Sequence, residues 1–199
     1  MAITDPDTPA PRRSDPTRAR ILEAARRRFA REGYDGTTIR AVAADADIDP
    51  SMVMRYYGNK DGLFAAAADV DLHLPDLTQV AQRQWGRRLV GHFFDRWEGR
   101  GGDETLGLLI RSAVTNAHAA ERLRAVADTQ LAAALERAGL DQPRRRASLI
   151  ASQMLGMAYC RYVVALPEIA SARPEDLVTA VGATVQRYMT GTLPPPAGG

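Results

Sequence analysis

The apolar residues of this 199-residue sequence recur at helical spacing, and no stretch of it alternates apolar and polar residues as a strand does. Ile21, Ala25 and Phe29, for example, fall four residues apart and would share one face of a helix. Alanine makes up about a sixth of the chain, and alanine, leucine and arginine are strong helix formers. The sequence therefore predicts an all-α fold.

Proline, glycine and capping residues predict how the chain divides. Residues 1–14 hold three prolines and no periodicity, so we expect a disordered arm. Asp15 followed by Pro16 is typical of a helix start, and Gly33 of a helix end. We predict a three-helix head with a helix-turn-helix over residues 15–60, a larger helical body over residues 61–192 and a tail over residues 193–199.

Within the body, apolar stripes and breaks predict a series of helices. We expect them over residues 60–71, 77–97, 104–119, 120–138 and 142–166, and from Pro174 onward. Three glycines predict a loop over residues 99–102. Residues 147–166 approach the length that spans a bilayer, but Arg161 and several small or polar residues lower the hydrophobicity. We therefore expect a helix buried in a bundle and no membrane partner.

The net charge of +2 does not by itself indicate a nucleic-acid partner, but its distribution is uneven. Between Arg12 and Arg31, eight arginines face only Asp15 and Glu23. A basic first helix is the charge pattern expected of a surface that binds phosphate. The alternative is a solvated helix face in a sequence biased toward arginine, since Lys60 is the only lysine beside 25 arginines.

Several classes of protein are excluded or made remote by the sequence. A single cysteine, Cys160, excludes a disulfide framework and favours a reducing cytoplasm. The residues near the N-terminus contain no apolar run of the kind found in a secretory signal, so we expect none. His73, His92 and His118 lack metal-binding spacing, and there is neither a glycine-rich phosphate loop nor a serine elbow. We predict no enzyme activity, cofactor or metal, and keep a helical enzyme as the remote alternative.

Residues 37–64 carry the clearest functional pattern, two short helices joined by a tight break. Thr37 or Thr38 is expected to cap the first of these helices, and Asp49 the second, which starts at Pro50. In a helix-turn-helix the second helix lies in the major groove of DNA. Arginine there can bind guanine edges, and methionine or tyrosine can contact the thymine methyl group. The residues expected on its exposed side are Pro50, Ser51, Met52, Arg55 and Tyr56.

The stretch from about Arg18 to Ala68 resembles the DNA-binding head of the TetR family of transcriptional regulators. The residues that carry the resemblance are Arg20-Ile21-Leu22, Ala24-Ala25, Phe29, Gly33-Tyr34, Thr37-Thr38-Ile39-Arg40, Ala43, Tyr57, Asn59-Lys60 and Leu63-Phe64. The resemblance implies a ligand-responsive repressor that binds a near-palindromic operator as a homodimer. An activator and a ligand-independent DNA-binding protein are the alternatives.

The resemblance also implies roles for individual residues. Thr38 would cap its helix and meet phosphate, Arg40 would reach a base or phosphate, and Lys60 would contact phosphate. Two positions depart from the family pattern. Asp47 stands where a turn glycine is usual, although aspartate tolerates the left-handed conformation. Met54 replaces an aromatic residue and cannot donate a hydrogen bond to phosphate.

For the body, the resemblance implies a ligand cavity among the helices. The residues expected to line it are Trp85, Phe93, His118 and Met157. Other candidates are the apolar and aromatic residues Phe94, Trp97, Met154, Tyr159 and Tyr162 and the polar residues His92, Asn116, Gln153 and Arg161. Because these residues are mostly apolar and the body is near neutral, we expect a small apolar effector. Ordinary core packing is the alternative for each. A ligand is expected to act by moving the helix that starts at Lys60.

The last two long helices are expected to form the interface of a homodimer. The first carries small residues that permit close packing, namely Ala147, Ala151, Gly156 and Ala158. The second carries an apolar stripe that needs a partner, formed by Leu177, Val181, Val185 and Tyr188. Burial within one subunit is the alternative for either surface.

Overall fold

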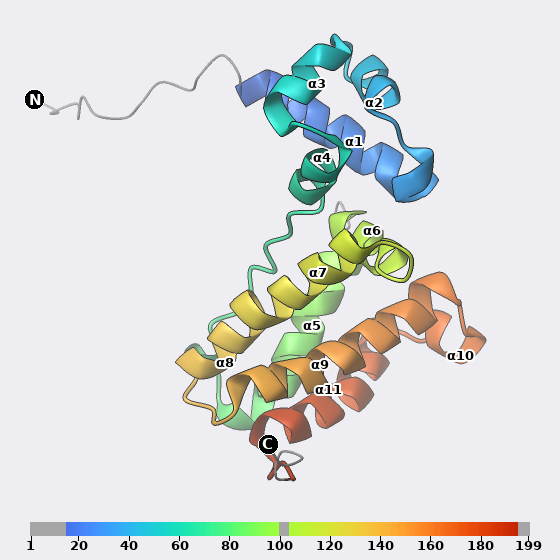
Figure 1. Cartoon of the computed structure of the whole chain (residues 1–199). Coiled ribbons are helices and arrows are strands. Elements are labelled where there is room, and N and C mark those ends of the chain that lie inside the picture. The colour runs from blue at the N-terminus through green and yellow to red at the C-terminus, as the bar shows by residue number, and fades with distance from the viewer. Residues whose placement is uncertain (1–14, 100–103, 195–199) are drawn as a thin grey trace, which may run out of the picture. The chain divides into compact units, whose positions relative to one another are not determined.

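The computed structural model describes residues 15–99 and 104–194, and every regular element in these ranges is a helix (Figure 1). The chain forms two compact units, with the division between Ala67 and Ala68. The predicted arm over residues 1–14 lies outside the described residues. So do residues 195–199 of the predicted tail and residues 100–102 of the predicted loop.

The head consists of α1 (Asp15–Gly36), α2 (Ile39–Asp45), α3 (Pro50–Tyr57) and α4 (Lys60–Ala67). Phe29 of α1 and Phe64 of α4 meet edge to face with ring centroids 5.0 Å apart, and both are buried. Ile21, Val53 and Leu63 complete this core. The division at residue 67 differs from the boundary predicted at residue 60, because α4 packs its three buried residues, Leu63, Phe64 and Ala67, within the head.

Local signals place the ends of the head helices. The Thr38 hydroxyl accepts the backbone N–H of Ala41 at 3.1 Å and so caps α2, while Thr37 is buried. The Asp49 carboxylate accepts the backbone N–H of Ser51 at 2.8 Å, one residue after Pro50 opens α3. Gly33, with φ of 71°, puts a kink near the end of α1, where the sequence predicts its end.

The described residues of the body contain five longer helices. They are α5 (Trp85–Glu98), α6 (Glu104–Ser112), α7 (Ala117–Val126), α9 (Pro143–Ala158) and α11 (Pro174–Thr190). Shorter elements are the 3₁₀ turns η1 (Leu77–Gln79) and η2 (Gln82–Gln84), the π-helical turns η3 (Ala127–Leu131) and η4 (Tyr159–Val163), α8 (Ala132–Arg137) and α10 (Pro167–Ala170).

Three predicted helix boundaries are wrong. The helix expected over residues 60–71 ends at Ala67. The expected helix over residues 77–97 begins only at Trp85, because Val80 is extended and the residues before α5 form two separate 3₁₀ turns. The expected break after residue 119 lies at residues 113–116 instead. There the Asn116 side chain accepts the backbone N–H of Ala119 at 3.0 Å and starts α7.

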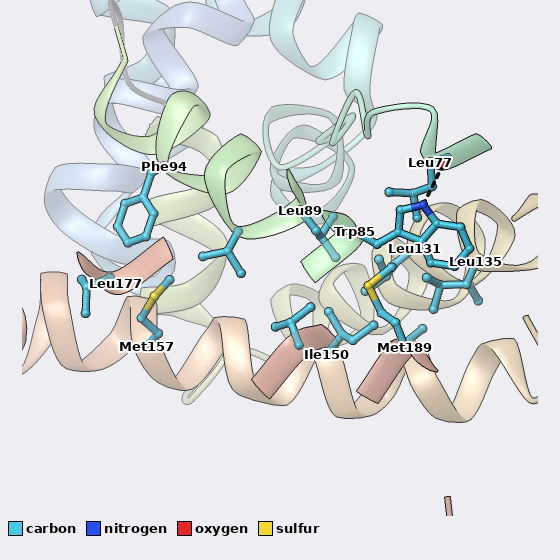
Figure 2. Packing of buried hydrophobic residues seen from close by; sticks show 14 residues of the cluster. Leu77, Trp85, Leu89, Phe94, Leu131, Leu135, Ile150, Met157, Leu177 and Met189 are labelled. Carbon is cyan, nitrogen blue, oxygen red and sulfur yellow. Dashed lines mark hydrogen bonds between the residues drawn. The ribbon is translucent and has the colours of Figure 1, made fainter. Parts of the chain in front are cut away.

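The core of the body is built where α5 lies beside α11 (Figure 1). Gly86 and Gly182 allow the two backbones to approach, since a Cβ on Gly86 would lie 2.5 Å from the backbone nitrogen of Gln186. Figure 2 shows Phe94 of α5 near Leu177 of α11, within a cluster of buried apolar side chains. Among the described residues, no helix combines the length and apolar character needed to cross a membrane.

A buried arginine joins the start of α9 to the end of α11. The Arg146 side chain is only 5% exposed, and its guanidinium donates to the Asp141 carboxylate at 2.6 Å. It also donates to the backbone oxygens of Tyr188 at 2.7 Å and Gly191 at 3.0 Å. The charge is therefore satisfied by polar atoms from both helix ends, as a buried cation requires.

Candidate nucleic-acid interface and ligand cavity

The turn between α2 and α3 has the conformation that a helix-turn-helix requires. Asp47 adopts a left-handed φ of 51°, which confirms that aspartate can replace the usual glycine here. Its backbone N–H donates to the Ala44 oxygen at 3.1 Å, and that of Ile48 donates to the Ala43 oxygen at 3.0 Å. Arg20 of α1 holds the turn from the other side, since its guanidinium donates to the backbone oxygen of Asp47 at 3.1 Å.

The side chains of α3 divide clearly into two faces. Val53 is fully buried, which fixes the rotation of the helix in the head. Ser51, Met54 and Arg55 are exposed on the opposite side, while the predicted contact residues Pro50, Met52 and Tyr56 are partly buried beside them. The exposed side of α3 therefore contains Ser51 and Arg55, as expected, together with Met54, the residue that replaces the aromatic side chain usual in the family.

The remaining predicted contact residues lie at the ends of α2 and α4. Thr38 and Arg40 are exposed in the first turn of α2. Lys60 is half-buried: its Nζ donates to the Asp35 backbone oxygen at 3.3 Å and lies 4.3 Å from the centroid of the Tyr34 ring. Lys60 is thus held inside the head. In contrast, the structure describes no hydrogen bond or ion pair for Arg40 or Arg55.

Most described arginines of α1 are engaged within the head. Arg28 binds the Asp45 carboxylate of α2 through two nitrogens at 2.7 and 2.8 Å, and Glu32 at 2.9 Å. These hydrogen bonds hold the pKa of Asp45 below its ordinary value. Arg27 pairs with Glu23 at 2.9 Å. Part of the excess positive charge predicted for this segment is therefore neutralised by neighbouring carboxylates, whereas Arg26 donates to the Ala67 backbone oxygen at 3.1 Å and has no carboxylate partner among the described residues.

Two tyrosines have structural roles in the head. Tyr34 stacks against Phe29, and its hydroxyl donates to the Asp61 carboxylate. Burial and this hydrogen bond raise the pKa of Tyr34 to about 12. Tyr57 donates to the Arg18 backbone oxygen at 3.3 Å. These contacts tie α1 to α3 and α4.

A cavity of about 110 Å³ lies within the body, between α5, α6, α7, η3 and α9. Its walls are made almost entirely of aliphatic side chains, with Phe93 as the aromatic one and His92 and Arg96 as the polar ones among the described lining residues. Of the four residues predicted to line a ligand site, only Phe93 lines this cavity. Of the wider set of candidates, His92 and Met154 also line it, whereas the described lining does not include Phe94, Trp97, Asn116, Gln153, Tyr159, Arg161 or Tyr162.

The other three predicted lining residues lie elsewhere. Trp85 is buried in the body core, and its indole N–H donates to the Leu77 and Val80 backbone oxygens at 2.8 and 2.9 Å (Figure 2). Met157 packs in the same core. His118 is exposed on α7. The polar candidate Arg161 instead pairs with Glu98 at 2.7 Å, so its charge is used within the fold.

A short segment beside the cavity is held by hydrogen bonds from several elements. The Gln130 side chain accepts the Leu72 backbone N–H at 2.7 Å and donates to the Val70 backbone oxygen at 2.7 Å. His92 Nε2 lies 2.8 Å from the Leu72 backbone oxygen, and Arg122 pairs with Asp69. Residues 69–72, which follow α4 directly, are thus fixed to the helices around the cavity. The sequence offers no local signal for this arrangement.

The outward faces of α9 and α11 differ from the predicted dimer surfaces. Leu177 and Val185 are buried, and Val181 and Tyr188 pack on the same core, so this stripe serves the subunit itself. Ala147 and Ala158 are also buried, and Ala151 lines the cavity. The exposed residues of α9 and η4 include Ser148, Ser152, Gly156, Tyr159 and Val163, and those of α11 include Thr179, Ala180, Ala183 and Arg187.

Comparison with known proteins gives family matches to both units. Residues 21–67 match the family described as bacterial regulatory proteins of the tetR family, and residues 84–189 match the tetracyclin repressor-like C-terminal domain. The HTH-type transcriptional repressor SCO4008 of Streptomyces coelicolor is 43% identical over 69 residues, and the HTH-type transcriptional repressor AcnR of Corynebacterium glutamicum is 38% identical over 55 residues. These matches cover 35% and 28% of this chain, and about a third of the length of either relative, 32% and 29%.

Solved structures agree over most of the chain. The TetR-family regulator SCO0857 from Streptomyces coelicolor A3 is similar with a TM-score of 0.62 and 29% identity, over 91% of this chain and 99% of its own. A TetR-like transcriptional regulator from Rhodococcus sp. RHA1 has a TM-score of 0.55 and 22% identity, over 90% and 96% of the two chains. The latter likeness concerns the fold alone.

Proposed function

The chain belongs to the TetR family of transcriptional regulators, whose members are DNA-binding proteins and not enzymes, and from this premise we propose that it is a ligand-responsive repressor. It binds a near-palindromic operator as a homodimer, and a small, mainly apolar effector releases it. The observation that carries the proposal is the exposed face of α3, which presents Arg55 on a helix whose start, turn and rotation are fixed by the head.

In this proposal α3 enters the major groove and Arg55 contacts base edges. Arg55 suits this role because it is exposed and has no hydrogen bond or ion pair within the described residues. Thr38 and Arg40, exposed in the first turn of α2, contact phosphate. Lys60 contributes less than the family resemblance implies, because binding phosphate would break its contacts with Asp35 and Tyr34.

The homodimer is proposed to form through the outward faces of α9, η4 and α11. Figure 1 shows α9 and α11 side by side, and their exposed residues are small at Gly156, Ala180 and Ala183. Small residues let helix backbones of two subunits approach closely. Exposed apolar side chains extend the surface, since Tyr159 is 40% and Val164 50% exposed. Burial of such side chains would stabilise association.

Release by a ligand is proposed to start at the cavity of the body. Leu72 and Leu74 form part of its wall, and both lie in the segment that leads on from α4. A ligand that displaces this segment changes the constraint on the chain between head and body. It favours release only to the extent that it binds the DNA-free conformation more tightly than the DNA-bound one.

The test begins with selection of bound sequences from random duplex DNA by the purified full-length chain. A two-fold symmetric site is expected, and Arg55→Ala should weaken its binding by about 1–3 kcal/mol and relax preference at one base per half-site. Arg137→Ala, which removes an exposed arginine on α8, serves as the control and should leave affinity unchanged. If Arg55→Ala behaves like the control, α3 is not the recognition helix. Reporter expression from the selected site then distinguishes repression from activation.

A further inference from the structure

The cavity of the body presents almost no polar surface among its described lining residues. Its two side chains with polar atoms are His92 and Arg96, both from α5. His92 Nε2 lies 2.8 Å from the Leu72 backbone oxygen, and because a carbonyl only accepts, the hydrogen of Nε2 is already donated there. Arg96 likewise has an interaction of its own, and its contribution to so apolar a wall is mainly its aliphatic stem.

The buried polar side-chain atoms near the cavity have partners as well. Among the described residues, the buried side-chain nitrogen or oxygen that lacks a hydrogen bond is Nε of Arg122, and Arg122 is not part of the described lining. The Gln130 amide is used by the backbone of Val70 and Leu72. A hydroxyl, amine or carbonyl group on a ligand would therefore leave water without finding a free partner in the described wall, and this loss weakens binding.

The size of the cavity limits the ligand further. About 110 Å³ is available, and an engineered apolar cavity of about 150 Å³ binds benzene in another protein. Met154 forms part of the wall, and a methionine side chain adapts to small differences in shape. A single ring or a branched chain of about five or six carbons matches this volume, whereas a fused-ring compound requires the helices to move apart.

We infer, resting on the proposed function, that the effector is a small hydrocarbon, of the size of a single ring or a short branched chain, that carries no hydrogen-bonding group. Its contacts are with aliphatic side chains and with Phe93. Its affinity comes from the removal of apolar surface from water. The site thus selects against polar molecules of the same shape and does not merely tolerate apolar ones.

Leu72 connects this site to the segment that follows α4. It lines the cavity, while its backbone oxygen accepts from His92 and its backbone N–H donates to Gln130. A hydrocarbon has no group that could compete for either hydrogen bond. The ligand therefore acts on this segment by its volume, against Leu72 and Leu74, and both hydrogen bonds persist in the complex.

The experiment compares ligands of nearly equal shape on the full-length protein without DNA. Toluene is paired with phenol and aniline, and benzene with pyridine, so that a hydrocarbon and its analogue differ by one hydrogen-bonding group. Calorimetry measures the binding of each. The wild type should bind each hydrocarbon roughly ten- to a hundredfold more tightly than its polar analogues. Equal or tighter binding of the polar analogues overturns the inference, and so does a lack of binding by both hydrocarbons.

A variant of the wall tests whether its lack of polar groups causes the preference. Met154→Gln keeps the length of the side chain and places an amide at the cavity, so it should reduce the preference for toluene over phenol about tenfold. Met154→Leu is the matched control, because it keeps the wall apolar at similar volume and should retain the full preference. An unchanged preference in a folded Met154→Gln protein contradicts the assignment.

A second variant tests whether the hydrocarbon occupies the cavity. Ala151→Leu adds volume to the lining and should abolish binding of toluene and benzene. Ala117→Leu makes the same change at an exposed position of α7 outside the described lining, and should leave binding unchanged. Full toluene binding by a folded Ala151→Leu protein places the site elsewhere and refutes the inference. If either variant does not fold, the other and the wild-type comparison decide.

Operator binding separates this inference from the proposed function. A protein that prefers hydrocarbons but selects no duplex DNA retains the apolar site and refutes the repressor. A protein that binds its operator and is released by phenol, aniline or pyridine, but not by toluene or benzene, remains a ligand-responsive repressor and refutes the hydrocarbon effector. Binding of toluene that leaves operator affinity unchanged refutes it as well.

Discussion

Replacement of Gly86 by alanine tests the helix contact on which the body is built. A Cβ at this position would lie 2.5 Å from the backbone nitrogen of Gln186 and 2.8 Å from its Cβ, and it would also meet the backbone oxygen of Gly182. These are backbone atoms or the root of a side chain, so a change of rotamer cannot relieve the overlap. The backbone N–H of Gly86 also donates to the Gln186 side chain at 2.8 Å. Gly86→Ala must therefore push α5 and α11 apart.

The expected change follows from two opposing effects. Overpacking of a core costs about 1–3 kcal/mol, and loss of the hydrogen bond to Gln186 about 1 kcal/mol more. Alanine favours the helix over glycine by at most about 1 kcal/mol, and less in the first turn of α5. We expect Gly86→Ala to lower the free energy of unfolding by about 1–3 kcal/mol.

Gly91→Ala is the matched control on the same helix. A Cβ at Gly91 meets no atom within 4 Å, so only the helix preference acts and stability should rise by up to about 1 kcal/mol. Urea unfolding followed by circular dichroism, at one protein concentration, measures both variants. Their free energies of unfolding should differ by at least about 1 kcal/mol, because Gly86→Ala loses about 1–3 kcal/mol while Gly91→Ala gains up to about 1 kcal/mol. Equal stability of the two variants would refute the close crossing at Gly86.

Three further predictions concern the buried arginine, the acid stability of the head and the dimer. Arg146→Met should destabilise the body by about 3 kcal/mol in urea unfolding, because the backbone oxygens it satisfies lose their donor; Arg144→Met at an exposed site should have little effect. The pKa of Asp45 is lowered in the fold by Arg28, so its stabilisation is present above the unfolded pKa of about 4 and is lost as the pH falls through the folded value. Arg28→Gln should accordingly make unfolding of the head less dependent on pH below about 5, and an unchanged dependence contradicts the pairing. Val164→Arg should weaken the dimer in light scattering without unfolding the subunit, and an intact dimer would place the interface elsewhere.

The features that the sequence predicted well are those decided within a few residues. Asp49 before Pro50 caps and opens α3 because the carboxylate needs only the next two residues to form its hydrogen bond. Asp47 takes a left-handed φ for a similarly local reason, which is the space and polarity of its own short side chain. The helix-turn-helix could therefore be located to within a residue without any information on tertiary packing.

The direction in which an apolar face points could not be predicted in the same way. The stripe that contains Leu177 and Val185 has the same spacing whether it meets a second subunit or its own core, and here it meets its own core. Trp85 was assigned to a ligand site because it is aromatic and helical. Two 3₁₀ turns instead bring Leu77 and Val80 back to its indole N–H and close the space around it. Both outcomes depend on contacts between residues far apart in the sequence.

The positive charge of the head was overestimated from the sequence for two reasons. One ion pair lies on a single helix and could have been predicted, and another joins two helices and could not. Glu23 lies four residues before Arg27, a spacing that already predicts an ion pair on one helix face. Asp45, which binds Arg28, lies 17 residues away and on another helix, so only the fold brings them together. Once such pairs form, the number of arginines in α1 says little about the charge available to DNA. What decides it is whether an exposed arginine has a partner within the described head, and by that criterion contacts with DNA are expected at Arg55 of α3 and Arg40 of α2.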